Sequence, residues 1–259
     1  MTDAMLDLPS HLRERLAVAL ESRVLPPQPS PSALRSILGI NDVEGVSRAI
    51  AEMEQLGVDG VAAAAWLRSL TKAEARAPRT DLVWSGPEVA GLHARDTRRV
   101  FEEVLGLADR SLWVSTYVYF DGPKAFEVLA RRMDAVQALR VTLLLNIQRK
   151  YGDKTGADQL VRRFAERLWR AEWPGKARPS VFYDPRALDP EARSGVLHAK
   201  AVVADDETVF VTSANLTEAA LDRNIELGLL VRDRALAASL STYFSGLIDR
   251  GLLKALPAD

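Results

Sequence analysis

Apolar residues recur every three or four positions through the first 75 residues, the spacing that places them on one face of a helix. Two such sets are Leu12, Leu16 and Leu20, and then Val43, Val46, Ile50 and Met53. Ser10 can cap the first helix, and the Pro-rich stretch Leu25–Pro31 separates the two sets. The pattern therefore predicts a small all-helical N-terminal region over residues 1–75, with no strand.

A further helix is predicted over Gly60–Lys72, because Gly57 ends the helix before it and Asp59 can cap it. The two helices have a helix-turn-helix outline. A DNA-reading helix presents polar side chains, whereas residues 61–66 have the apolar sequence VAAAAW, so packing is the better interpretation. The stretch Lys72–Thr80, with Pro78 and alternating charge, is the predicted linker.

After Asp81 the apolar period changes, and strand-like runs alternate with amphipathic helices. The predicted strands are 82–85, 111–119, 140–147, 179–183, 197–204, 208–212 and 225–232, and the predicted helices are 94–108, 123–136, 156–171 and 235–249. Residues 143–145 are leucines within an otherwise apolar run, which is typical of a central strand. The order predicts an α/β domain over residues 81–259, with a sheet covered by helices on both faces.

Composition limits the classes of protein and site that remain. Of the 259 residues, 47% are hydrophobic, as in an ordinary globular protein with a full core. No apolar run reaches the roughly 20 residues that span a bilayer, and the first residues lack the order of a secretory signal, so we expect a cytoplasmic protein without membrane contact. Cysteine is absent and only His11, His93 and His198 offer imidazoles, so no structural zinc site and no metal cofactor are expected.

The net charge of −1 hides a basic segment, because residues 140–180 hold ten Lys or Arg against four Asp or Glu. Such a segment can attract a phosphate backbone, although a solvated helical face of mixed charge explains it equally well. Within it, Arg149, Lys150 and Lys154 follow a predicted central strand as a loop, where binding sites of α/β sheets tend to lie. These three residues are our candidates for nucleic-acid binding.

His198 and Lys200 are two positions apart in the predicted strand 197–204, so their side chains should share one face. An isolated His in an apolar strand is more often a hydrogen-bonded core residue. A buried Lys on the same face, however, is costly without an anionic partner, and a phosphate oxygen is such a partner.

The next strand is followed by Ser213 and Asn215, whose hydroxyl, carboxamide and backbone amides can gather around the same anion. Taken alone, this stretch is an ordinary capping sequence. Further on, Glu226 can accept the Nδ1 proton of His198 and fix its tautomer, the alternative being a plain surface acid. Asn224 lies two positions before it, on the same predicted face.

These residues resemble the motif of the phospholipase D superfamily, which is His-x-Lys, four residues, Asp, six residues, then Gly-Ser and an Asn shortly after. His198, Lys200 and Asp205 match in spacing, and Ser213, Asn215 and the downstream Asn224/Glu226 follow. One departure is Thr212, which stands where the family usually has Gly. The resemblance covers about residues 81–250 and implies a mixed β-sheet sandwiched between helices.

The resemblance also implies a metal-independent phosphodiesterase without a cofactor. In that family, one His attacks phosphorus to form a phosphohistidine and a second His protonates the leaving oxygen. Lysine and asparagine side chains stabilise the developing charge, and the Asp, here Asp205, is structural support. Since this chain has one motif, a homodimer with the two-fold axis near His198 is expected.

Within the superfamily, the layout also resembles the phospholipase D-like subunit of the DISARM anti-phage defence systems. The residues that carry this likeness are the helical extension, Asp81–Pro87, Thr97–Phe101 and the single late motif. It implies a nuclease or other nucleic-acid-processing component, on DNA rather than RNA, with other defence-system subunits as further partners. The alternatives are a phospholipid hydrolase and a non-catalytic subunit that binds nucleic acid or a defence complex.

Overall fold

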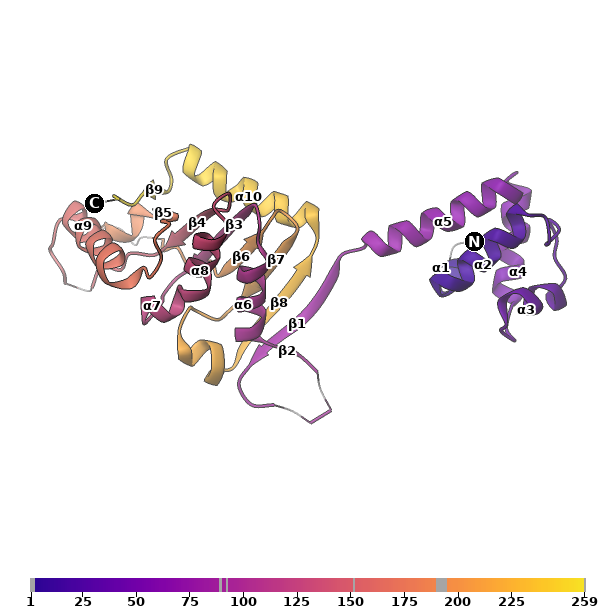
Figure 1. Ribbon diagram of the computed structural model, residues 1–259, viewed down its shortest axis with the longest axis horizontal. Helices are drawn as coiled ribbons and strands as arrows, with labels where there is room; N and C mark the ends of the chain where they lie inside the picture. Colours follow the sequence, from indigo (N-terminus) through magenta and orange to yellow (C-terminus); the bar gives the residue numbers. More distant parts are fainter. Residues whose placement is uncertain (1–2, 89, 92, 151, 190–194, 259) are drawn as a thin grey trace. The chain divides into compact units, whose positions relative to one another are not determined.

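The computed structural model of the chain describes residues 3–88, 90–91, 93–150, 152–189 and 195–258. Its chain contacts divide it into two compact units, Met1–Ala77 and Pro78–Asp259 (Figure 1). Each unit has a buried apolar cluster of its own.

In the described part of the first unit, all regular structure is helical. The helices are α1 (Asp3–Leu6), α2 (Ser10–Glu21), α3 (Pro31–Leu38), α4 (Glu44–Gln55) and α5 (Gly60–Arg76). The apolar positions that predicted α2 and α4 are all buried in one cluster. They are Leu12, Leu16 and Leu20 in α2, Val43 at the N-cap of α4, and Val46, Ile50 and Met53 within it. The sequence pattern did not predict α3, which follows the Pro-rich stretch. It begins where the Ser30 hydroxyl accepts the N–H of Ala33 at 3.2 Å and ends at Gly39, whose φ is 71°.

Two predicted caps and the predicted linker need correction. Pro9 occupies the N-cap of α2, so Ser10 is already helical, and Asp59 occupies the N-cap of α5 without a side-chain hydrogen bond to it. The helix α5 continues to Arg76 and β1 begins at Arg79, so only residues 77–78 lie between them. Ala63 and Ala64 of α5 are buried, as expected for a helix that packs rather than reads DNA.

The second unit contains one mixed sheet, which confirms the predicted α/β fold class. Its described strands lie in the order β2-β1-β8-β7-β6-β3-β4-β5-β9, with β3, β4 and β5 parallel. Their bounds are β1 Arg79–Ser85, β2 Arg95–Asp96, β3 Ser111–Thr116, β4 Arg140–Leu145, β5 Ser180–Tyr183, β6 Ala201–Ala204, β7 Thr208–Thr212, β8 Glu226–Arg232 and β9 Lys254–Ala255. Leu143, Leu144 and Leu145 are fully buried in β4, which has a partner strand on either side.

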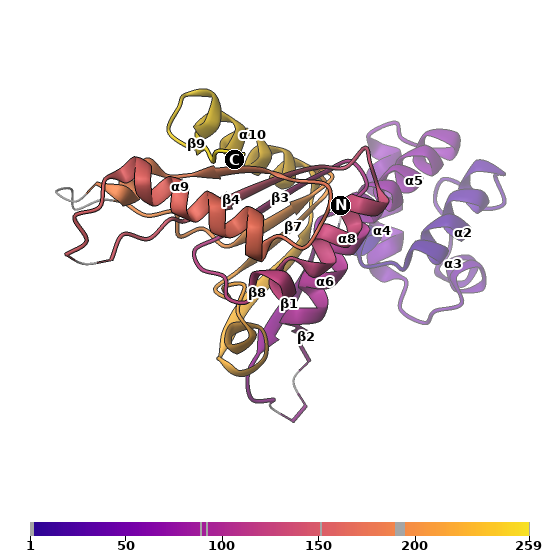
Figure 2. The same cartoon turned by 60° about the vertical axis from the view of Figure 1, so that its left-hand side comes forward.

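Helices cover both faces of this sheet, as Figures 1 and 2 show. One face packs against α6 (Thr97–Leu107), α8 (Glu127–Ala135) and α9 (Ala157–Arg167). The other face packs against α10 (Arg234–Asp249), whose Ala237 and Phe244 cover Val203 and Val209. Short elements complete the unit: α7 (Gly122–Ala125), the π-helical turns η1 (Leu168–Glu172) and η3 (Ala219–Arg223), and the 3-10 turn η2 (Pro185–Leu188). Within the described ranges, no helix has the length and apolar character needed to cross a bilayer.

Several predicted boundaries differ from the structure for local reasons. α6 begins at Thr97 because Asp96 caps it, accepting the N–H of Arg99 at 2.8 Å. The predicted helix 123–136 is divided at Phe126, whose φ of −102° and ψ of 0° are not helical and whose ring is buried. The predicted helix 156–171 leaves α-helical geometry after Arg167 and becomes η1.

Candidate active site

His198 and Lys200 come directly before β6, so the predicted strand 197–204 is too long at its start. The ladder with β3 begins at Ala201, since the carbonyl of Ala199 accepts the Ser115 hydroxyl at 2.9 Å instead of a strand N–H. The two side chains nevertheless lie together. Nζ of Lys200 is 3.2 Å from Nδ1 and 3.4 Å from Nε2 of His198, so a cation stands beside an exposed imidazole.

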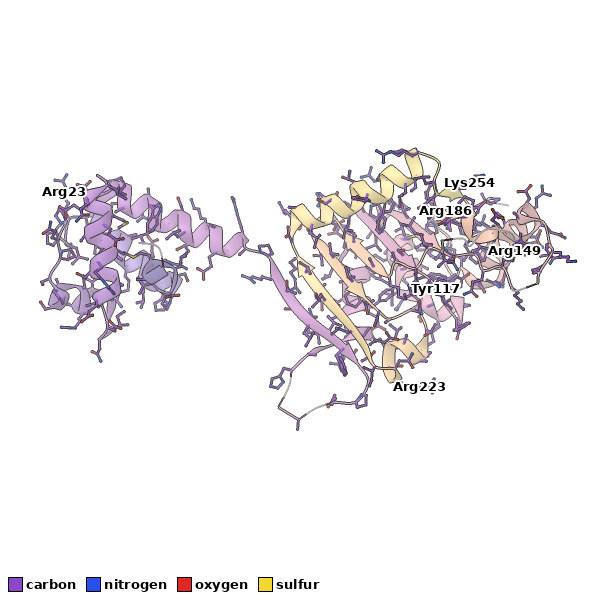
Figure 3. The ribbon with its side chains drawn as sticks, turned by 180° about the vertical axis from the view of Figure 1, so that it is seen from behind. Arg23, Tyr117, Arg149, Arg186, Arg223 and Lys254 are labelled. Carbon is purple, nitrogen blue, oxygen red and sulfur yellow. The ribbon has the colours of Figure 1, made fainter. Side chains whose placement is uncertain are left out.

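Two neighbours set the environment of this pair. Partial burial of the Lys200 ammonium lowers its pKa below the usual value for lysine, and the charge of Glu226 opposes that effect. Tyr117, which is labelled in Figure 3, lies directly after β3. Its ring centroid is 4.6 Å from that of His198 and 6.0 Å from Nζ of Lys200. Our sequence analysis missed Tyr117, although its position at the carboxyl end of a predicted strand was a signal.

Ser213 and Glu226 are joined directly. The Ser213 hydroxyl donates a short hydrogen bond to the Glu226 carboxylate and accepts the N–H of Leu227 at 3.1 Å. The other Glu226 oxygen accepts the Asn224 amide at 3.4 Å. The predicted hydrogen bond from His198 to Glu226 does not occur among the described residues, where the Glu226 oxygens accept from Ser213 and Asn224. Glu226 acts on the Lys200 charge instead.

Asn215 is held by its oxygen and offers its amide. Oδ1 of Asn215 accepts the N–H of Val118 at 3.3 Å, which fixes the carboxamide beside the segment that follows β3. Thr212, at the position that departs from the family motif, accepts the N–H of Ala214 at 3.0 Å through its hydroxyl. The same hydroxyl donates to the carbonyl of Leu227 at 3.4 Å, so the side chain bonds both within its own turn and to the start of β8.

Asp205 lies in the turn between β6 and β7 and supports the start of β3. Its carboxylate accepts the N–H groups of Asp109, Arg110 and Ser111 at 2.8–2.9 Å. Burial raises the pKa of Asp205, but these three donors and the Arg110 charge outweigh burial and hold it below the usual value. Asp205 has a φ of 56°, a left-handed conformation that Asp tolerates better than most residues. The geometry is that of a structural residue.

The three basic candidates differ in their contacts. Nε and Nη1 of Arg149 donate to the carbonyls of Leu188, Asp153 and Thr155 at 2.6–2.8 Å, so much of its donor capacity is used within the loop, and its binding of nucleic acid stays a prediction. Lys150 is exposed and forms part of a cavity wall. Lys154 is exposed, and Tyr151 lies outside the described residues.

The site offers a cation and hydrogen-bond donors. Lys200 supplies positive charge, Asn215 an amide, and His198 an exposed imidazole nitrogen that can act as nucleophile or proton carrier. Across the described ranges, no three His, Asp or Glu side chains gather in a group that could hold a metal ion. The arrangement is suited to an anionic, tetrahedral group such as a phosphodiester.

The family model described as "Cardiolipin synthase, PLD-like domain" matches residues 101–248, which is more than half of the chain. The chain belongs to this phospholipase D-like family. The matched range includes every residue of the motif from His198 to Glu226. No curated protein matches the chain.

Three solved structures of low identity are similar to this phospholipase D-like chain. NucT from Helicobacter pylori is 16% identical, with a TM-score of 0.45, over 67% of this chain and 97% of that one. Nuc from Salmonella typhimurium, described as a phospholipase D family member, is 14% identical, with a TM-score of 0.43, over 69% and 98%. Phosphatidylserine synthase of Haemophilus influenzae Rd KW20 is 16% identical, with a TM-score of 0.46, over 75% and 46%. The family match, rather than these likenesses, establishes the membership.

Proposed function

We propose that the chain is a metal-independent phosphodiesterase that acts on nucleic acid through a phosphohistidine at His198. The observation that carries the proposal is the Lys200 ammonium 3.2 Å from an exposed His198 ring, with Asn215 and Ser213 on the neighbouring turn. An ammonium and an amide stabilise charge on the non-bridging oxygens, the task that a metal ion performs in other phosphodiesterases.

The proposed reaction needs two imidazoles. One His198 forms a bond to phosphorus while the bond to the leaving oxygen breaks, and His198 of the partner subunit gives that oxygen its proton. In the second half, water attacks phosphorus, the partner's His198 accepts the proton of that water, and the P–N bond breaks. The His198 ring packs against the Tyr117 ring in a tilted arrangement, which helps to hold it in place for this attack.

A second copy of the chain is the proposed source of the other imidazole, and the structure offers a surface for it. Beyond the edge of α10, Leu82, Val211, Leu227 and Leu229 are each 45–53% exposed. The strand register places Leu229 opposite both Leu82 and Val211, and Leu227 follows Glu226 directly. We call these four residues the β8 apolar surface. A cluster of this kind beside the motif favours burial against another subunit.

The subunit proposal is tested by light scattering of the full chain and of Leu229→Arg. We expect a dimer for the wild type, and a monomer without hydrolysis for Leu229→Arg, because an unpaired charge cannot be buried in an apolar interface. Leu107→Arg, an equal change at the end of α6, where Leu107 is 66% exposed, is the control and should stay dimeric and active. A wild-type monomer that hydrolyses a diester contradicts the two-subunit mechanism.

The reaction class is tested by incubating the purified chain with labelled DNA, RNA and a phosphatidyl ester in the presence of EDTA. Hydrolysis of a nucleic acid that persists in EDTA supports the proposal. Loss of activity in EDTA that Mg²⁺ restores contradicts the metal-independent mechanism, and hydrolysis of the lipid ester alone supports a phospholipid hydrolase instead.

We further propose that this nuclease belongs to an anti-phage defence system of the DISARM type. The helical first unit, the segment Asp81–Pro87 and the single late motif support this proposal. The test is phage plating on bacteria that carry the complete gene cluster with wild-type or His198→Asn protein. Equal plating efficiency in the two strains contradicts a catalytic role in defence, although a binding subunit remains compatible with it.

A further inference from the structure

A cavity of about 450 Å³ adjoins the candidate active site on the side of β4. Tyr117 belongs to its wall, and the same ring lies 4.6 Å from His198, so the cavity and the proposed nucleophile share a side chain. The strand register pairs Thr116 with Leu145, so Tyr117 and Asn146 leave neighbouring parallel strands at the same edge of the sheet. The volume is within the usual range of ligand pockets, roughly 300–1,000 Å³.

Asn146 is the unusual residue of this cavity. It lies directly after β4, is 7% exposed, and belongs to the cavity wall. Neither its amide nitrogen nor its oxygen has a hydrogen-bond partner among the described residues. A buried amide without a partner costs about 1–3 kcal/mol, so the chain itself does not compensate the burial of this group. A ligand with both a donor and an acceptor can do so.

The cations at the cavity differ in whether they are already paired. Arg167 lies 3.0 Å from Glu172, which also accepts the Tyr119 hydroxyl, so its charge is balanced. Lys150 and Arg163 also belong to the wall, are exposed, and form no ion pair within the described part of the chain. Two unpaired cations beside a buried amide indicate a ligand that carries both a negative charge and a polar planar group.

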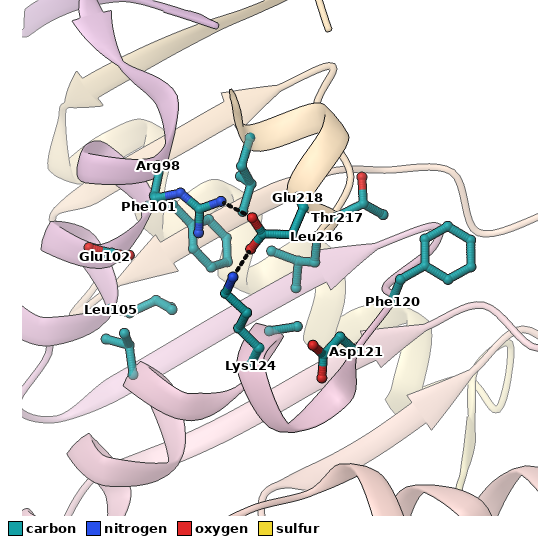
Figure 4. A pocket seen from close by; sticks show the side chains of 13 residues that line it. Arg98, Phe101, Glu102, Leu105, Phe120, Asp121, Lys124, Leu216, Thr217 and Glu218 are labelled. Carbon is teal, nitrogen blue, oxygen red and sulfur yellow. Dashed lines mark ion pairs between the residues drawn. The ribbon is translucent and has the colours of Figure 1, made fainter. Parts of the chain in front are cut away.

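A second pocket, whose wall also includes Phe120, differs from the larger cavity in how its cations are paired (Figure 4). It measures about 40 Å³, and both of its cations, Arg98 and Lys124, are paired with carboxylates. Arg98 pairs with Asp222 and Glu218, and Lys124 pairs with Glu218 at 2.9 Å. The chain itself pairs the cations of that pocket, whereas Lys150 and Arg163 of the larger cavity have no ion-pair partner among the described residues.

We propose that the larger cavity binds one unpaired nucleotide of a single-stranded nucleic acid, next to the phosphate that His198 attacks. The base lies against Tyr117 and exchanges hydrogen bonds with the Asn146 carboxamide, and the adjoining phosphate lies at Lys150 and Arg163. Carboxamides bind base edges through paired donor and acceptor atoms, and aromatic rings stack on exposed bases. A base inside a duplex cannot enter such a cavity, which is why the substrate is single-stranded. This inference rests on the proposed function.

The test uses the full chain and end-labelled oligonucleotides, single-stranded or duplex, with one abasic residue placed at each position in turn. We expect a single-stranded substrate to be preferred, and an abasic residue at one position beside the cleaved bond to lower kcat/KM about 10- to 100-fold, the range of one bidentate base contact. Asn146→Ala should cause a similar loss and make the enzyme indifferent to that abasic residue. Hydrolysis of methyl p-nitrophenyl phosphate, which has no base, should be unchanged in Asn146→Ala.

Arg163 belongs to the basic wall of the cavity, and Arg162 on the same helix provides a matched control for it. Arg163→Ala should weaken cleavage of the single strand, whereas Arg162→Ala should not, because Arg162 is exposed on α9 and is not part of the cavity wall. Asn146→Asp replaces the amide donor by an acceptor at nearly equal volume, and it serves if Asn146→Ala does not fold. Equal effects of Arg162→Ala and Arg163→Ala, or abasic substrates cut at the normal rate at every position, overturn the proposal.

Failure of the proposed function is recognised separately. If no diester is hydrolysed, fluorescence anisotropy of the same intact and abasic oligonucleotides still measures the cavity, and Asn146→Ala should bind them equally. If phosphatidylglycerol vesicles are hydrolysed and only that reaction is lost in Asn146→Ala, the cavity serves a lipid and the nucleotide assignment is wrong.

Discussion

Asp205 accepts three backbone N–H groups with its carboxylate, whereas His198, in the same motif, is exposed and lies against Lys200 and Tyr117. The environment of Asp205 lowers its pKa and so stabilises its charged form, while burial of Lys200 lowers its pKa and so disfavours the charged form. The hydrogen-bonding capacity of the Asp205 carboxylate is satisfied within the fold. His198 and Lys200 need a partner from outside the chain, which is the arrangement of a binding or catalytic site.

The strongest test of this difference between His198 and Asp205 is His198→Asn, which keeps a planar polar side chain and removes the nucleophile. We expect hydrolysis to fall by about 10⁴-fold or more, as for the loss of other covalent nucleophiles, with no change in thermal unfolding. Mass spectrometry of the intact protein after a brief substrate pulse should show a covalent adduct on the wild type and none on the variant.

Substrate binding by His198→Asn shows whether a loss of hydrolysis comes from the missing nucleophile or from a misfolded protein. His198→Asn should bind the substrate nearly as well as the wild type, because the Lys200 ammonium and the Asn215 amide remain. Retained hydrolysis by a variant free of wild-type enzyme removes His198 from the chemistry and favours the binding-subunit alternative.

Lys200→Ala should have the next largest effect, about 10²- to 10³-fold on kcat/KM, the range for one stabilising donor. Since burial lowers the Lys200 pKa, its charge is lost at a lower pH than in an ordinary lysine, and activity should fall on the alkaline side accordingly. In Lys200→Arg this alkaline limb should move to higher pH, because a guanidinium stays charged. An alkaline limb at the same pH in both enzymes means that another group titrates.

Replacing Lys200 should change the free energy of unfolding in the opposite direction from the replacement of a structural residue. A folded-state pKa below the unfolded value means that the folded state disfavours the ammonium, and this penalty is fully present below the folded pKa and relieved as pH rises through it. We therefore expect Lys200→Ala to be as stable as the wild type at pH 7 or more so. A large loss of stability shows that Lys200 supports the fold.

How far the sequence predicts this molecule depends on whether a feature is local. The periodicity predicted the helical first unit and an α/β sheet, and the fully buried leucines of β4 confirm its central place. The short strands β2 and β9 were not predicted, because two-residue strands leave no period to detect. Phe126, where the predicted helix is divided, packs against Tyr119 and against Trp173, and Trp173 lies far away in the sequence.

The motif predicted which residues are close together but not every hydrogen bond between them. Spacing brought His198 and Lys200 together even though they precede the strand, because two positions still separate them. It paired Glu226 with His198, whereas Glu226 bonds Ser213, which is on the adjacent strand end. The basic charge of the loop grouped Arg149 with Lys150, and only the fold shows that Arg149 bonds carbonyls of its own loop and of Leu188.

Asp205→Asn tests the structural role of Asp205. We expect a smaller effect than for the substitutions above, measured as the free energy of unfolding. The amide keeps one acceptor oxygen and turns an NH₂ group toward backbone donors, which costs about 1–3 kcal/mol in the free energy of unfolding. The lowered pKa adds stability to the wild type above the unfolded value, near 3.9, and this is lost as pH falls through the folded pKa. Urea unfolding at about pH 5 and pH 3 should show a smaller pH dependence in Asp205→Asn. An equal pH dependence in both proteins shows that other carboxylates carry it.

The smallest expected effect comes from Lys150→Ala combined with Lys154→Ala, because both side chains are exposed and neither residue belongs to the motif of His198. Each lysine that contacts a phosphate of a single strand contributes about 0.7 to the slope of log affinity against log salt, so two contacts should reduce the slope by about 1.4. The measurement is anisotropy of a labelled single strand at several salt concentrations. Arg149→Ala, in the same loop, should leave that slope unchanged and lower stability instead, since its guanidinium donates to three carbonyls. If Arg149→Ala changes the slope and the lysine pair does not, then Arg149 leaves its carbonyls to bind phosphate, and the distinction between committed and available groups fails in this loop.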